Sequence, residues 1–212
     1  MRKNICQILV LLFFINGIQA QNYNDSKSST KDRFYENVKK ADLTKTKTEE
    51  LLKIIEERNR VLKDLDTKKK QADVPYSIQD PGTLYNFKIN NARNYYARKI
   101  NGLLTYKEYC EFAVDDYKNE AWQDAKPEYE NLINNNAHLK EDQKQKLSEF
   151  LYNYHLNQLL TTAYYSFDKT VQKPKLGILR FSFEKEFKKR CKDYNIKNHD
   201  SNGENTNGFE WN

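Results

Sequence analysis

Three histidines lie along the chain, and their spacing does not assemble a metal site. His138, His155 and His199 are too far apart in sequence to share neighbouring turns of one helix. On the helix expected around His155, the residues four positions away are Leu151 and Leu159, and neither side chain ligates a metal. We therefore expect no metal site and no cofactor.

Adjacent carboxylates are the second candidate for chemistry. The pairs Glu56-Glu57 and Asp115-Asp116 are neighbours in sequence, so on a helix they project about 100° apart and do not converge as an acid and a base. The sequence also contains no glycine-rich phosphate loop and no Gly-x-Ser-x-Gly nucleophile elbow. It therefore predicts no catalytic residues and a protein that is not an enzyme.

The first twenty residues have the pattern of a secretory signal peptide. Arg2 and Lys3 precede an apolar run from Ile8 to Ile15, and Ala20 ends the segment. The run is too short to span a membrane, although a retained signal anchor is the alternative. We expect residues 1–20 to be removed, which leaves a periplasmic or secreted protein with no transmembrane segment and no nucleic-acid partner.

Only Cys110 and Cys191 lie beyond the signal segment, and two interpretations of them stay open. In an oxidising compartment they could form a disulfide, which closes a loop of about eighty residues and stabilises by about 4 kcal/mol in the loop-entropy model. Alternatively, both are free thiols on helix faces. A bridge would be structural, because no neighbouring residue predicts a reactive thiolate.

The elements that position these residues are predicted to be helices. With 6 glycines and 4 prolines, the chain has too few turn residues for a many-stranded β-fold. Residues 21–32 are small and polar and are expected to form a flexible leader, and residues 196–212 a disordered tail. The helical domain covers 33–195. It is expected to be all-α, with four to five helices arranged as two hairpins in series over about 43–126 and 139–195.

Prolines and apolar periodicity set the expected limits of the later helices. Pro127 is expected to break or restart a helix, and residues 173–177, which include Pro174 and Gly177, to separate the last two helices. Apolar residues recur every three to four positions. The expected core face of one helix is Leu147, Phe150, Leu151, Tyr154, Gln158 (or Leu159) and Thr162. That of the next helix is Leu179, Phe183, Phe187, Cys191 and Tyr194.

Three segments resemble a known family motif. They are Leu43-Thr-Lys-Thr-Lys47, Leu104-Thr-Tyr-Lys-Glu108 and Leu139-Lys-Glu-Asp-Gln143. Each resembles the Leu-Thr-x-x-Gln motif of the Spy/CpxP family of small exported helical proteins, in the form found in Bacteroidetes. Lys47 and Glu108 replace the glutamine, and Lys140 replaces the threonine. The motif is also a good helix start, with a hydroxyl cap followed by polar residues.

The resemblance implies a periplasmic chaperone, not an enzyme. Such a protein would hold partly unfolded clients on a concave face of crossed helices, through lysines and tyrosine rings. The chain has 15 tyrosines and 11 phenylalanines. The alternative is a structural or interaction module of the cell envelope, which docks permanently on a partner or on a second copy as a homodimer. The candidate client-binding residues flank the predicted core faces: Tyr95, Tyr96, Arg98, Lys99, Tyr152 and Tyr165.

Overall fold

A computed structural model describes residues 23–72 and 81–196, and these residues are all-helical, as predicted. Within them there are six helices instead of the expected four to five. The helices are α1 (Tyr23–Lys40), α2 (Lys45–Ala72), α3 (Pro81–Leu103), α4 (Tyr106–Asn135), α5 (Glu141–Tyr164) and α6 (Lys169–Asp193). In the described part of the chain, none of these helices combines the length and apolarity that crossing a membrane requires.

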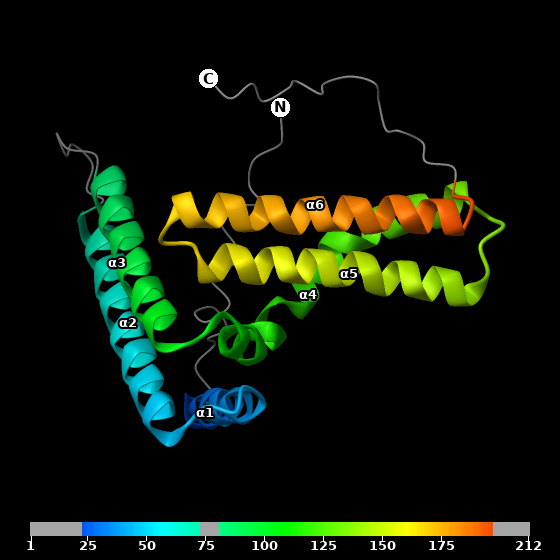
Figure 1. Ribbon diagram of the computed structural model, residues 1–212. Helices are drawn as coiled ribbons and strands as arrows, with labels where there is room; N and C mark the ends of the chain where they lie inside the picture. Colours follow the sequence, from blue (N-terminus) through cyan, green and yellow to red (C-terminus); the bar gives the residue numbers. More distant parts are fainter. Residues whose placement is uncertain (1–22, 73–80, 197–212) are drawn as a thin grey trace.

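The helices form two groups, which Figure 1 shows at a steep angle to each other. Helices α2 and α3 lie side by side. Helix α4 packs along α5, and α5 packs against α6. Helix α1 lies against α4, and α3 contacts α5, so the α2–α3 pair abuts one end of the α4–α5–α6 group.

Each of the three motif segments marks the start of a helix. Thr105 caps α4 and forms a capping box with Glu108, which satisfies two otherwise unpaired backbone N–H groups. Before α2, the backbone N–H of Lys47 donates to Thr44 Oγ1 at 3.3 Å. Before α5, Gln143 Oε1 accepts from the backbone N–H of Lys140 at 2.9 Å. The helix starts predicted at these segments are therefore confirmed.

Alanines on α4 and leucines on α5 form a close helix–helix contact. The alanines at 113, 121 and 125 are buried, and so are Leu147, Leu151 and Leu160 of α5. Small side chains on one helix let the leucines of the other approach its backbone. Leu147 and Leu151 were predicted as core. Thr162 was predicted to share their face but is exposed, and the last turns of α5 bury Thr161 and Tyr164 instead.

Aromatic rings fill the contact between α5 and α6. Phe183 of α6 stacks on Phe150 with centroids 5.0 Å apart and on Tyr154 at 3.9 Å. Phe187 follows it at 5.6 Å, nearly parallel. Cys191 is buried with Leu147 at the far end of the same face. The predicted core face of the last helix is therefore confirmed over these residues.

Both proline predictions were wrong, because each proline lies inside a continuous helix. Helix α4 runs through Pro127 to Asn135, where Leu132 still packs on the core of α5 and α6. Helix α6 begins at Lys169, since the Asp168 side chain accepts from the backbone N–H groups at 170 and 171. This N-cap overrides the break that Pro174 was expected to impose.

The chain ends also differ from the predictions. Most of the expected leader belongs to α1, which begins at Tyr23. Ile196, placed in the expected tail, is buried against Leu139. Residues 1–22, including the predicted signal peptide, and residues 197–212 lie outside the described part of the chain.

Cys110 and Cys191 are both free thiols, so the disulfide interpretation was wrong. Cys110 lies one turn after Tyr106 in α4, and Tyr106 hydrogen-bonds to Thr161 near the end of α5. Cys191 lies near the start of α5, beside Leu147. The length of α5 between these positions is about 20 Å at 1.5 Å per residue, whereas a bridge needs Cα atoms within about 7 Å.

Candidate binding surface

Large apolar side chains that remain exposed concentrate on two segments. Of the eight in the described residues, six lie on α3 and on residues 169–183 of α6. These six are Leu84 (44% exposed), Phe87 (64%), Tyr95 (54%), Val171 (39%), Ile178 (64%) and Phe181 (70%). Single exposed apolar residues are normal, but a concentration of them indicates an interaction surface.

The same two segments carry positive charge only. Helix α3 has four lysines and arginines and no acidic residue. Residues 169–183 of α6 also have four cations and no acidic residue. Helix α4, by contrast, has eight acidic residues and three lysines. Exposed apolar groups therefore coincide with the parts of this protein that attract anions.

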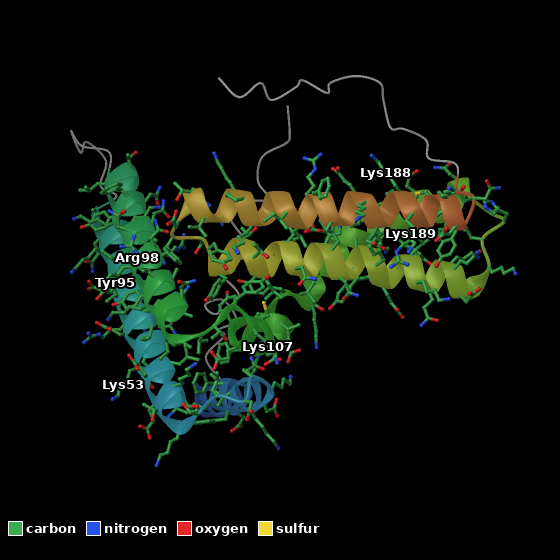
Figure 2. The ribbon with its side chains drawn as sticks, in the orientation of Figure 1. Lys53, Tyr95, Arg98, Lys107, Lys188 and Lys189 are labelled. Carbon is green, nitrogen blue, oxygen red and sulfur yellow. The ribbon has the colours of Figure 1, made fainter. Side chains whose placement is uncertain are left out.

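On α3 the apolar and basic residues share one face, which we call the α3 face: Leu84, Phe87, Tyr95 and Arg98. The Nζ of Lys99 lies 4.8 Å from the Tyr95 ring centroid, within range of a cation–π interaction, and 3.5 Å from Glu57 of α2. Figure 2 shows Tyr95 and Arg98 on the α2–α3 pair, away from Lys188 and Lys189 at the other end of α6.

Arg98 connects the α3 face to the start of α6. Its guanidinium carbon lies 5.7 Å from the ring centroid of Phe167, in the turn before α6. On the far side of that turn lies the α6 face, which we define as Val171, Lys175, Ile178 and Phe181. The two faces thus flank one junction of the fold, where α3, α5 and α6 meet.

A cavity of about 280 Å3 opens beside the α6 face. Helix α6 is fixed on either side of it. Gln172 Nε2 donates to the carbonyl oxygen of Thr162 at 2.7 Å, and Phe183 stacks on α5. The lining residues are Tyr106 of α4, Thr161 and Tyr165 of α5, and Lys175, Ile178, Leu179 and Ser182 of α6. The lining residues from α6 include no aromatic ring.

Tyr106 forms the polar wall of the cavity. Its hydroxyl is 2.8 Å from Thr161 Oγ1, and its ring stacks on that of Tyr165 with centroids 6.0 Å apart. Burial raises the pKa of Tyr106 to about 12, so this hydroxyl stays protonated at neutral pH. Burial likewise raises the pKa of the nearby Cys110 thiol, which argues against a reactive thiolate.

The structure separates the six candidate client-binding residues. Tyr95 and Arg98 are exposed and Lys99 is half-exposed, on α3. Tyr165 lines the cavity, whereas the half-buried Tyr152 lies on α5 outside both faces. Tyr96 is 3% exposed, and burial raises its pKa, with Glu57 adding to the shift. It was therefore a wrong choice for a binding residue, because α2 covers it.

The most exposed apolar residues were missed in the sequence. These residues are Phe87, Ile178 and Phe181. Ile178 and Phe181 lie off the predicted core face of Leu179, Phe183 and Phe187, and their position on another side of the helix could have identified them. Val171 was missed because the last helix was expected to begin after Gly177.

Two of the motif segments meet in space. Lys47 Nζ lies 2.7 and 2.8 Å from the two carboxylate oxygens of Glu108, so the last residues of the first and second copies pair. Glu108 also accepts from the Thr105 backbone N–H at 2.8 Å. The hydrogen bond from Lys47, followed by the one from Thr105, lowers the pKa of Glu108 to about 2. This pair fixes the start of α4 to the start of α2.

Replacing Glu108 by glutamine tests this pair, because glutamine can still close the capping box but cannot pair as an anion with Lys47. We expect the free energy of unfolding at pH 7 to fall by about 1 kcal/mol. The folded-state pKa lies below the ordinary value of 4.5. The pair therefore stabilises the folded protein above pH 4.5, and its contribution to the free energy of unfolding is lost as the pH falls towards 2.

The measurement is urea unfolding of wild type and E108Q at pH 7 and at low pH, with K47M completing a double-mutant cycle. The difference between the two proteins should shrink on acidification, since other titrating carboxylates are common to both. A difference that does not change with pH would show that the pair contributes nothing through its charge.

Other polar side chains have structural roles or lie apart from one another. His155 Nε2 lies 3.3 Å from Glu128 Oε1 but is buried without a hydrogen bond, and His138 Nε2 lies 3.1 Å from the Tyr194 carbonyl oxygen. Asp115 and Asp116 pair with Lys40 and Arg33 of α1. Among the described residues, no group of three metal-ligating side chains comes together; His199 lies outside them.

A scan against protein-family models, a search of curated proteins and a search of solved structures all return no match for this chain. What the surface binds must therefore be argued from its own residues.

Proposed function

We propose that this is an exported helical binding protein that holds partly unfolded polypeptides through the α3 face and the α6 face. The observation that carries the proposal is the coincidence of exposed apolar side chains with segments that have cations and no acidic residues. Cations attract the anionic groups of a client over long range, and the apolar side chains then provide weak, nonspecific contact. The signal-peptide pattern supports export of the protein to the periplasm or beyond.

The test is suppression of aggregation. Purified protein is mixed at equal molar ratio with a client that unfolds on reduction of its disulfides, and light scattering is recorded. We expect wild type to slow aggregation and the double variant F87S/F181S to lose most of that effect, because it removes two of the largest exposed rings. Both residues are more than half exposed, so the fold should be retained.

The matched control is W122S. Trp122 is also an exposed aromatic residue, at 41%, but it lies on the acidic helix α4. The W122S variant should suppress aggregation as well as wild type does. Equal suppression by F87S/F181S would contradict the proposal. A fixed assembly whose mass in solution does not change when the client is added would favour the structural module instead.

A further inference from the structure

We infer that the cavity beside α6 is an anchor site for one aromatic side chain of a bound polypeptide, with an acidic residue next to it in the client sequence. This inference rests on the proposed function and names the client chemistry that the α6 face would select. The size, the walls and the charge of the cavity support it.

The size of the cavity points to a side chain. At about 280 Å3 it lies just below the range of about 300–1,000 Å3 that small-molecule and cofactor sites occupy. One large side chain entering from the surface fits this space better than a whole cofactor does. An extended segment lying along the α6 face would bring such a side chain to the opening, because Ile178 lies both on that face and in the lining.

The walls point to an aromatic ring. Tyr106 and Tyr165 present two rings that lie 20° from parallel on one side, and Ile178 and Leu179 form the apolar opposite side. A third ring can stack on the tyrosines or pack edge-on against them. Such ring contacts stabilise a bound aromatic side chain by more than the burial of its apolar area alone. The Tyr106 hydroxyl is already engaged with Thr161, so an apolar guest leaves no polar group of that pair unsatisfied.

The charge at the opening points to an acidic neighbour in the client. Lys175 is in the lining, and no carboxylate of the described residues is there with it. The preceding and following turns of α6 add Lys169, Lys173 and Arg180, of which Arg180 pairs with Glu184 at 2.8 Å and Lys169 follows the N-cap Asp168. The charge nearest the anchor is therefore that of Lys175, and aspartate or glutamate is the client residue that this cation favours.

The experiment measures fluorescence anisotropy of a labelled peptide with the core Asp-Phe-Glu binding to the full protein. Two matched peptides carry Asp-Ala-Glu and Asn-Phe-Gln. We expect the alanine peptide to bind at least tenfold more weakly, because a buried phenyl ring is removed. We expect the amide peptide to bind about threefold more weakly at low salt, with the difference reduced by added salt.

On the protein side, S182F places a ring of the protein's own into the cavity, and S182A leaves the cavity open. Ser182 is an exposed residue of α6, so both variants should fold, which circular dichroism checks. We expect S182F to bind the Asp-Phe-Glu peptide at least tenfold more weakly than wild type, and S182A to bind it as tightly as wild type. K175Q should bind the Asp-Phe-Glu peptide about threefold more weakly than wild type. K185Q, on the same helix but outside the lining, should bind it as wild type does.

Three results would overturn the inference: equal binding of the phenylalanine and alanine peptides, unchanged binding by S182F, or binding to phosphatidylglycerol vesicles in place of the peptide. The last would assign the basic, apolar face to a membrane surface. Failure here is distinguishable from failure of the proposed function. Suppression of aggregation that survives in S182F and is lost in F87S/F181S leaves the proposed function standing without this anchor site.

Discussion

Replacing Leu147 by alanine is expected to lower the free energy of unfolding by about 3 kcal/mol, or roughly 150-fold in the folding equilibrium. Leu147 is fully buried, and it packs in one cluster with Leu139, Cys191 and Ile196. These residues come from the start of α5, from the segment before it, and from the end of α6 with the residues that follow it. Truncation removes apolar contacts and leaves a cavity that three packed segments cannot easily close. Urea unfolding followed by circular dichroism gives the value.

The control is the same substitution at Leu84, which is 44% exposed on the α3 face. It should change the free energy of unfolding by less than about 0.5 kcal/mol. A cost at Leu147 no larger than that at Leu84 would mean that the packing of α5 on α6 differs from that described here.

Replacing Phe183 by alanine is expected to cost about 2 kcal/mol and to weaken the attachment of α6 selectively. Phe183 stacks on Phe150, Tyr154 and Phe187, so it is the central ring of the α5–α6 contact. It is only half-buried, and the cost is therefore below that of a fully buried phenylalanine. Amide hydrogen exchange should accelerate more in α6 than in α2, because α6 packs mainly on α5.

Phe181 provides a control of the same residue type two positions away. It is 70% exposed, so F181A should leave both the free energy of unfolding and the exchange of α6 nearly unchanged. If amide hydrogen exchange accelerates equally in all helices of F183A, α6 unfolds only together with the whole protein.

The contrast between these two phenylalanines explains why α6 serves as a binding face in our proposal. Helix α6 has one neighbour along most of its length, so a single face is enough to attach it. The remaining circumference is free to carry Ile178 and Phe181 in contact with solvent. Both side chains are more than half exposed, and exposed apolar side chains that gather on one face indicate a contact with another molecule.

The sequence by itself determined that the chain is helical, where several helices begin, and which faces they bury. Thr105 and Glu108 cap α4 through local hydrogen bonds that need no distant partner. The spacing of Leu179, Phe183 and Phe187 likewise depends only on the helical period. The prediction of a helix break at Pro174 was wrong. Asp168 caps the helix six residues earlier, and α6 continues through the proline.

Only the tertiary structure decided which of these faces meet. The pairing of Lys47 with Glu108 joins positions 61 residues apart. The burial of Tyr96 depends on α2 lying against α3. The separation of Cys110 from Cys191 depends on their lying towards opposite ends of α5. The cavity beside Tyr106 depends on residues of α4, α5 and α6 meeting there. Helical periodicity fixes the direction of a side chain relative to its own helix, whereas its burial depends on how many neighbouring helices surround it.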